Sequence, residues 1–309
     1  MQQAIHNTQP VINRFGKEGA GEFTPSRYAV RIGDVDVALI SDGILPLPTS
    51  TMSTNVSEAD RNAWFDGRFL QRDMVDWALN IALVRSGERL ILIDSGVGDG
   101  FEYFTRAGRS VMRLESAGID LAAITDIVIT LMHMDHVGGL NVDGVKARLR
   151  RDVRIHVAAA EMKFWENPDF SKTVMPKTVP PALRKAARFV ELYRENIVQF
   201  GERVDIAPGV SARVTGGHTP GHCVVDVASQ DDKLTFVGDA IFEVGFDHPT
   251  WQNGFEHDPE RATEVRLALL NEAAEGGGLL AATHVAFPSI GHVAKDGDHF
   301  RFVPVQWDY

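Results

Sequence analysis

The chain contains 309 residues, of which 44% are hydrophobic and 24% are charged. This composition is typical of a globular protein, and the length suits one large domain or two smaller ones. The formal net charge is −11, which disfavours binding to nucleic acid because a phosphate backbone selects basic surfaces. We therefore expect a small molecule, and not a nucleic acid, as the binding partner.

The chain carries a single cysteine, Cys223. One cysteine excludes an internal disulfide and a cysteine-rich zinc site, but it leaves histidine-rich metal sites open. The first residues contain no apolar run of signal-peptide length, and no stretch approaches the ~18 consecutive apolar residues of a membrane span. The sequence therefore predicts a cytoplasmic protein with no membrane partner, or a secreted or periplasmic protein whose signal has been removed.

The first half of the chain is rich in strand patterns. Residues 1–26 are polar and lack periodicity, so they predict an N-terminal arm before a single domain of residues 27–309. Residues 28–43 alternate apolar and polar side chains around a Gly-Asp turn, and residues 80–96 contain two β-branched runs joined by Ser-Gly-Glu-Arg. Each pattern predicts a β-hairpin. Residues 110–119 predict a helix that ends at its glycine.

The second half repeats this order of strands followed by helices. Residues 126–131 and 154–161 predict strands, and residues 209–229 predict a strand, a loop and another strand. A strong helix follows, with Asp258 as its N-cap and Pro259 as its first residue. Because the strands gather in two blocks with helices after each, we predict two sheets packed face to face with helices outside. This is a four-layer αββα sandwich of the α+β class.

Three side chains that can bind metal lie within four residues at the end of one predicted strand. His133, Asp135 and His136 follow the apolar run of residues 127–131 and precede two glycines. A strand cannot easily bury so much polarity without a partner, whereas a loop at the strand end can aim these side chains at one ion. The alternative explanation is a polar surface loop.

Three further strand ends carry residues of the same kinds. His218 lies in a His-Thr-Pro-Gly-His loop, Asp239 ends a Val-Gly-Asp strand, and His284 follows an apolar run. Each has an ordinary explanation when it is taken alone, namely a turn or a structural histidine. A sandwich brings strand-end loops from both sheets to one edge, so together these residues predict a single metal centre.

In this order and spacing, the residues resemble the signature of the metallo-β-lactamase superfamily, His-x-His-x-Asp-His followed by His, Asp and His. The resemblance extends from about Tyr28 to the C-terminus and is strongest to the methyl parathion hydrolase-like subgroup. The similar segments are ALISDGILPLP, LILIDSG, HMDHVGGL, HTPGH, THVAFPSIGHV and FRFVPV. The resemblance implies the metallo-β-lactamase fold, a metal-dependent hydrolase and a homodimer.

The resemblance also implies two metal sites that share one carboxylate. The complete site would consist of four residues, Asp135, His136, Asp239 and His284. The second site would consist of three, His133, His218 and the shared Asp239. The first histidine of the signature is replaced by Leu131, which cannot coordinate a metal, so we expect the second site to be weak or empty. Zinc is the expected ion, and the ligands also suit manganese or iron.

Further roles follow from the same resemblance. Asp135 and Asp239 would be the catalytic residues, and Asp94 would orient the metal ligands, with a turn cap before Ser-Gly as the alternative. From the sequence itself, His222 is interpreted as a loop residue or as one that orients the ligands. Trp165 matches an aromatic residue of the substrate pocket in the methyl parathion hydrolase-like subgroup. Other candidates for the apolar pocket wall are Phe164, Phe246 and Trp251, for which core packing is the alternative.

These features predict a hydrolase whose metal-activated hydroxide attacks a neutral, partly apolar ester-like or activated aryl substrate, such as an aryl phosphotriester. No cluster of lysine or arginine suits a highly anionic substrate. One alternative is a lactonase of the acyl-homoserine-lactone type. Two alternatives of another class use the same fold, an iron-dependent oxidoreductase and a non-catalytic metal-binding protein.

Overall fold

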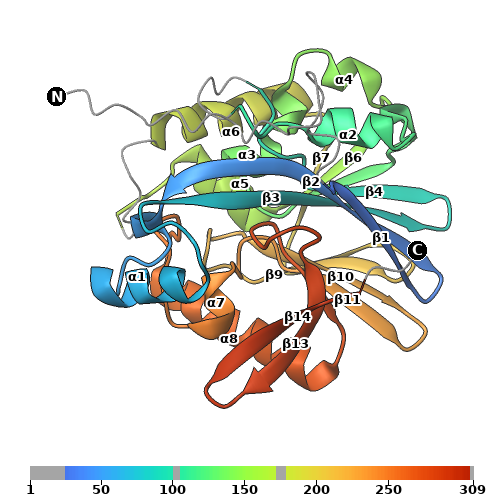
Figure 1. Cartoon of the computed structure of the whole chain (residues 1–309). Helices are drawn as coiled ribbons and strands as arrows, with labels where there is room; N and C mark the ends of the chain where they lie inside the picture. The colour runs from blue at the N-terminus through green and yellow to red at the C-terminus, as the bar shows by residue number, and fades with distance from the viewer. Residues whose placement is uncertain (1–24, 100–104, 172–178, 307–309) are drawn as a thin grey trace, which may run out of the picture.

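A computed structural model describes residues 25–99, 105–171 and 179–306. Its strands form two mixed seven-stranded sheets that pack face to face, with helices on the outer surfaces of both (Figure 1). This arrangement confirms the predicted four-layer sandwich. The N-terminal arm predicted for residues 1–26 lies almost entirely outside the described residues. No helix in the described ranges is both long and apolar enough to cross a membrane.

The first sheet follows chain order from β1 to β7. Its strands are β1 (Arg27–Ile32), β2 (Val35–Pro48), β3 (Met74–Ser86), β4 (Arg89–Ile93), β5 (Asp126–Ile129), β6 (Arg154–Ala158) and β7 (Ile197–Phe200). Strands β1 to β4 pair antiparallel, and β4 to β7 pair parallel. Both predicted hairpins are present. Their turns contain Gly33 (φ 54°) and Gly87 (φ 56°), in the left-handed region that glycine adopts without strain.

The second sheet has the order β14-β13-β12-β11-β10-β9-β8. Its strands are β8 (Arg203–Ala207), β9 (Val210–Val214), β10 (Cys223–Ser229), β11 (Asp232–Phe236), β12 (Leu279–Ala281), β13 (Ile290–Asp296) and β14 (His299–Pro304). Only β11 and β12 pair parallel, because α8 connects them across the outer face of the sheet.

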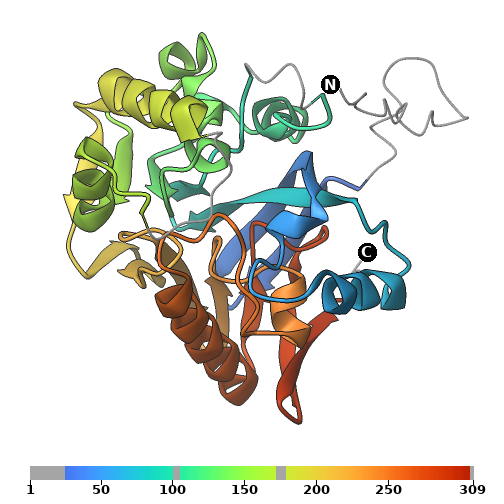
Figure 2. The ribbon, with the colours of Figure 1, turned by 90° about the vertical axis from the view of Figure 1, so that its left-hand side faces the viewer.

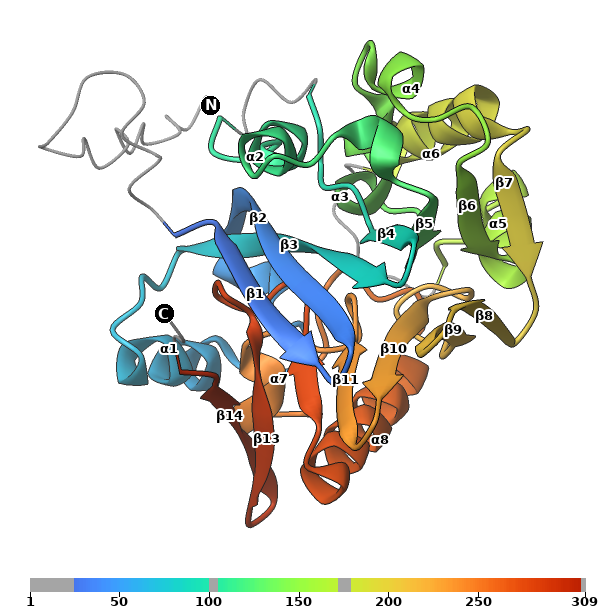
Figure 3. The same cartoon turned by 90° about the vertical axis from the view of Figure 1, so that its right-hand side faces the viewer.

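The helices divide between the two outer surfaces. They are α1 (Glu58–Gly67), α2 (Ser110–Ser116), α3 (Met134–Val137), α4 (Val145–Arg148), α5 (Ala159–Glu166), α6 (Val179–Tyr193), α7 (Val244–Asp247) and α8 (Pro259–Gly276), with the 3₁₀ turns η2 (Thr49–Thr51), η3 (Leu121–Ala123) and η4 (Gly139–Asn141). Helices α2, α4 and α6 cover the first sheet, and α8 covers the second (Figure 3). Seen from the opposite side, α6 (yellow) and α8 (orange-red) are far apart, with both sheets between them (Figure 2).

The predicted start of α8 is correct, but two predicted strands are too long, and the one predicted over residues 126–131 ends at Ile129. Asp258 caps α8 by accepting the N–H of Arg261, and Pro259 is its first residue. The strand predicted over residues 154–161 ends at Ala158, and α5 begins at the next residue. The three alanines continue the apolar pattern of the strand, and periodicity alone does not separate a short buried strand from a helix.

The main core lies between the two sheets, where inward-facing side chains interdigitate. Leu39 and Val84 of the first sheet and Val225 and Phe236 of the second are at most 1% exposed. Beyond the paired strands, the Cys223 N–H donates to the Thr130 carbonyl at 2.9 Å and so joins the sheets directly. This junction joins the end of β5 to the start of β10, so the loop that follows β5 and the loop that precedes β10 lie at one edge.

Candidate metal centre

The first group of metal-capable residues lies on a short helix rather than in a loop. Strand β5 ends at Ile129, and His133 is still extended (φ −63°, ψ 160°) before α3 begins. Asp135 and His136 then lie in the single turn of α3. Gly138 and Gly139 follow, and a Cβ on either would overlap a backbone oxygen of the 95–97 segment. The helical turn can therefore pack this close to the first sheet only with glycine at both positions.

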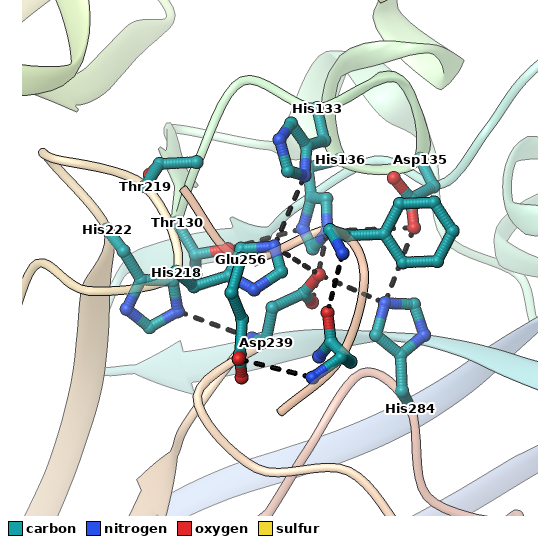
Figure 4. A network of polar contacts seen from close by, with 12 residues as sticks. Thr130, His133, Asp135, His136, His218, Thr219, His222, Asp239, Glu256 and His284 are labelled. Atoms are coloured by element: carbon teal, nitrogen blue, oxygen red, sulfur yellow. Dashed lines mark hydrogen bonds and ion pairs between the residues drawn. The ribbon is translucent and has the colours of Figure 1, made fainter. Parts of the chain in front are cut away.

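The second sheet supplies the other three residues. His218 follows β9, Asp239 follows β11 and His284 follows β12, each beyond the last residue of its strand. Figure 4 shows these side chains converging with those of His133 and His136 from the first sheet. All five are at most 8% exposed. The structure thus brings all six residues predicted from the sequence together in two groups that share Asp239.

The first group consists of Asp135, His136, Asp239 and His284. The neighbouring ligand atoms are 3.1–3.7 Å apart: His136 Nε2–Asp239 Oδ1 and His284 Nε2–Asp239 Oδ2 at 3.1 Å, and Asp135 Oδ2 at 3.5 and 3.7 Å from the two imidazoles. Metal–ligand bonds of about 2.0–2.2 Å give tetrahedral edges of about 3.3–3.6 Å. The four residues therefore lie close enough together to hold one ion.

Two atoms of the first group also indicate that it can hold an ion. His136 Nε2 and Asp239 Oδ1 are buried and only 3.1 Å apart, yet neither has a hydrogen-bond partner among the described residues. Buried polar atoms are rarely left without a partner. Their lone pairs are therefore available for an ion between them, and the mixed imidazole and carboxylate donors fit zinc or another first-row divalent metal.

The second group consists of His133, His218 and Asp239. His218 Nε2 lies 3.2 Å from both His133 Nδ1 and Asp239 Oδ2, again the length of a tetrahedral edge. The side chain of Leu131 is fully buried and offers no donor atom. Two imidazoles and a shared carboxylate are enough protein ligands for an ion with an open position.

The two groups differ in their electrostatics. Burial lowers the pKa of every one of the four imidazoles, because it penalises the charged form. At His136 and His284, neighbouring carboxylates led by Asp239 outweigh burial and raise the pKa above its usual value, well above it at His136. At His133 and His218 burial dominates, and the pKa falls well below its usual value.

Other residues fix the orientation of the first group. Asp94 Oδ2 accepts from His136 Nδ1 at 2.8 Å and from Thr130 Oγ1 at 2.7 Å. His284 Nδ1 lies 2.8 Å from the Ala78 carbonyl, to which it donates. In both imidazoles the proton is therefore on Nδ1, which leaves the Nε2 lone pair for the metal. Asp94 has the contact expected of an orienting residue.

His222 supports Asp239 rather than a metal. Its Nε2 accepts the backbone N–H of Asp239 at 3.2 Å, and its Nδ1 lies 2.7 Å from Thr215 Oγ1. Burial lowers the pKa of His222 to about 4, so the ring is neutral and can accept this N–H. The side chain of His222 thus helps to position the start of the Asp239 loop.

Sequence reasoning missed Glu161, whose carboxylate connects both ligand loops. It is 1% exposed and accepts four hydrogen bonds: from Met132 N and Trp165 Nε1 at 2.8 Å, from Thr219 Oγ1 at 2.6 Å and from Gly221 N at 3.0 Å. Because all four partners donate, the ionised carboxylate satisfies them best. Its sequence signal was hidden by the strand predicted through residue 161.

His257 was also missed, because it follows no predicted strand. Its Nε2 lies 3.0 Å from His133 Nε2, and its backbone N–H donates to the His218 carbonyl at 2.8 Å. Burial lowers the pKa of His257 to about 4.

The predicted pocket residues separate into two sets. Trp165 and Phe164 are partly exposed and pack edge to face, 5.6 Å between centroids, and Trp165 lies 6.0 Å from the His133 ring. Phe246, in contrast, is 2% exposed and packs on Phe302 in the core beneath α8, so it cannot form an open pocket wall. Trp251 stacks on His248 at 4.0 Å, and its place in the pocket stays a prediction.

Comparisons with known proteins agree with this geometry. Of the curated proteins, beta-lactamase-like protein 2 homolog of Drosophila melanogaster is 28% identical over 168 residues, which cover 54% of this chain and 48% of that protein. Among solved structures, AidC, a dizinc quorum-quenching lactonase, superposes with a TM-score of 0.84 at 23% identity, covering 92% of this chain and 99% of AidC. AbOPH, a hydrolase in the beta lactamase superfamily, gives 0.81 at 25% identity with the same coverage.

The family model of the metallo-beta-lactamase superfamily matches residues 75–284. This span contains every residue of both ligand groups, from His133 to His284. The assignment to the methyl parathion hydrolase-like subgroup, and the alignment of Leu131 with the first signature histidine, stay predictions. With its sandwich fold, its ligand groups and this match over most of its length, the chain belongs to the metallo-β-lactamase superfamily.

Proposed function

We propose that this protein is a metal-dependent hydrolase that acts on a neutral, partly apolar ester-like substrate. The observation that carries the proposal is the pair of ligand groups that share Asp239. The first group, with four ligands, would hold zinc. The second, with three, would hold a second ion more weakly.

The residues around the ions have distinct parts in such a reaction. A bound divalent ion lowers the pKa of water and polarises the oxygen of the substrate. Asp239 would help to hold both ions, since its Oδ1 lies beside His136 and its Oδ2 lies beside both His284 and His218. Asp135 is the most exposed carboxylate of the centre, with 13% of its side chain accessible, and burial raises its pKa. It is therefore the best placed group to accept a proton from the attacking water.

The surroundings of the second group support a substrate with an apolar part. Phe164, Trp165 and Phe170 are partly exposed and contact one another edge to face, with centroids 5.6–6.3 Å apart. The Trp165 ring is held by its hydrogen bond to Glu161. Rigid, partly exposed aromatic rings beside polar groups are typical of small-molecule sites. An aryl phosphotriester would place its aryl group against these rings.

A lactone is the second candidate, because AidC, with the TM-score of 0.84, is a lactonase. Parallel assays with a nitrophenyl phosphotriester and an acyl-homoserine lactone distinguish the two substrates. The rate ratio would identify the substrate class, and no turnover of either by the fully loaded protein would contradict the proposal. Visible absorption from iron in the purified protein would favour an oxidoreductase instead.

Replacing Asp239 by alanine removes the carboxylate common to both groups, so we expect metal content and hydrolysis to be lost together. Elemental analysis of the purified variant and both assays measure this. Asp205→Ala, at an acid whose side chain is 83% exposed, is the matched control and should change neither. An Asp239→Ala variant with full metal content and rate would exclude the assignment.

A further inference from the structure

In three of the four ligand histidines, the ring nitrogen that does not face the ligand group has a polar neighbour. A histidine that binds a metal through one nitrogen almost always donates the other N–H to an acceptor, which fixes the tautomer and the ring direction. In the first group, the acceptors are the Asp94 carboxylate for His136 and the Ala78 carbonyl for His284. In the second group, the corresponding neighbour of His133 is another imidazole, His257, with the two Nε2 atoms 3.0 Å apart.

The His133 nitrogen that contacts His257 determines what His257 can do. His133 Nδ1 faces His218 Nε2 at 3.2 Å, so Nδ1 is the ligand atom of the second group. A nitrogen that binds a metal needs its lone pair, and the proton of a neutral imidazole must then be on Nε2. This N–H is aimed at His257 Nε2, which lies on the opposite side of the ring from the second group.

We propose that His257 is a positioning residue of the second group. Its Nε2 accepts the Nε2–H of His133 and thereby holds His133 as an Nδ1 ligand. The inference rests on the part of the proposed function in which the second group binds an ion. It explains how the second group, which has only three ligand residues, keeps His133 ready to bind a metal.

The backbone of His257 strengthens the argument, because it reaches the other imidazole of the same group. The His257 N–H donates to the His218 carbonyl at 2.8 Å, and the next N–H, of Asp258, donates to the Gly217 carbonyl at 3.1 Å. One residue therefore contacts both histidines of the second group, the first through its side chain and the second through its backbone.

The loop that carries His257 is itself firmly held. Glu256, the preceding residue, forms a fully buried ion pair with Arg266 of α8. The His257 ring is 4% exposed and packs against Phe164 and Phe170, with centroids 4.8 and 5.1 Å away. Its position next to His133 is thus also supported by aromatic packing and by the neighbouring ion pair.

Two variants test the role of the His257 side chain. His257→Leu keeps an apolar side chain in the aromatic surroundings but removes the acceptor, whereas His257→Gln supplies a carbonyl oxygen in its place. Stoichiometry comes from elemental analysis, and the affinity for the first and second equivalents of Zn²⁺ comes from titration against a chromophoric chelator. Co²⁺ loading gives an absorption band for each occupied group. His292→Leu, at an exposed histidine of β13, is the control.

We expect the leucine variant to lose about 10–100-fold in affinity for the second equivalent, the usual effect of losing an orienting partner. Affinity for the first equivalent should stay unchanged, which also shows that the variant is folded. The glutamine variant should regain most of the lost affinity.

Three results would overturn the inference in different ways. Unchanged binding of both equivalents by His257→Leu would show that His257 does not position His133. An equal loss of the second ion in both variants would make His257 a direct ligand instead. A wild-type chain that binds only one ion under all conditions would overturn the second site itself, together with the role proposed for His257.

Discussion

The imidazoles on the two sides of Asp239 have opposite electrostatic surroundings. His136 and His284 face carboxylates that raise their pKa above the usual value, despite burial that lowers it. At His133 and His218 burial outweighs the attraction of Asp239, and the pKa of both imidazoles falls well below its usual value. The first pair of imidazoles therefore holds protons up to a higher pH than the second pair in the metal-free protein.

This difference predicts that the two equivalents of zinc release different numbers of protons. A ligand must be deprotonated to bind a metal, so zinc entering the first group displaces the protons held by the raised pKa of His136 and His284. Zinc entering the second group displaces none from His133 or His218. Affinity for the first equivalent should therefore fall as the pH is lowered, from neutral pH downwards, more steeply than affinity for the second.

Calorimetric titration of the metal-free protein at pH 7, in buffers of different ionisation enthalpy, measures the protons released at each step. Asp94→Asn removes one of the carboxylates that raise the pKa of His136, so it should reduce the protons released in the first step. Equal proton release for both equivalents would contradict the pKa shifts described for the two groups.

At the scale of elements, α5 determines how the two ligand loops lie relative to each other. Its residue Glu161 accepts N–H groups from the loop before α3, through Met132, and from the loop after β9, through Gly221. A Cβ at Gly221 would overlap the backbone of Glu161, so the loop can approach α5 closely only with glycine there. The His133–His218 separation thus depends on one buried carboxylate.

We therefore predict that Glu161→Gln weakens both the fold and the second group. The amide NH₂ would face two donors that now meet a carboxylate oxygen, and each hydrogen bond to a charged group contributes about 1.5–3 kcal/mol. Urea unfolding should show a loss of this order, and zinc titration should show weaker binding of the second equivalent. Glu166→Gln, at an exposed acid of the same helix, is the control. Unchanged stability would exclude this role.

The helices, strands and loops differ in how well the sequence predicts them, because only some of their features have local signals. The hairpins and the start of α8 were predicted because their signals are local, as with the Gly-Asp turn and the Asp258 cap. The six metal-capable residues were predicted because each follows a strand. The roles of Glu161 and His257 were not, since their partners Thr219 and His133 lie 58 and 124 residues away in the chain. Nor does local pattern distinguish a core aromatic such as Phe246 from a pocket wall.

At the scale of the whole molecule, the metal centre joins the two sheets. The first sheet and α3 supply His133, Asp135 and His136, while loops of the second sheet supply His218, Asp239 and His284. An ion that binds these residues binds only the folded state, in which the two sheets are packed together. Bound metal should therefore add to the free energy of unfolding of the entire sandwich.

Metal removal is predicted to destabilise the protein by a measurable amount. Binding to the folded state alone contributes about 2.7 kcal/mol when the free metal is at 100 times its Kd. Urea unfolding with zinc and with a chelator measures the difference. The Asp239→Ala variant is the control, because it should respond to neither. Equal unfolding midpoints for the wild type with zinc and with chelator would contradict a metal shared by the two sheets. The homodimer implied by the resemblance stays a prediction.

The buried thiol of Cys223, where the two sheets meet, allows the link between metal binding and sheet packing to be measured with a chemical probe. The thiol is fully buried where the sheets meet, burial raises its pKa, and the chain has no other cysteine. A thiol reagent can reach it only while the sandwich is transiently open, so the labelling rate reports the population of open molecules under native conditions. We expect zinc to slow labelling of the wild type but not of Asp239→Ala, and equal slowing of both would show that the ion acts elsewhere.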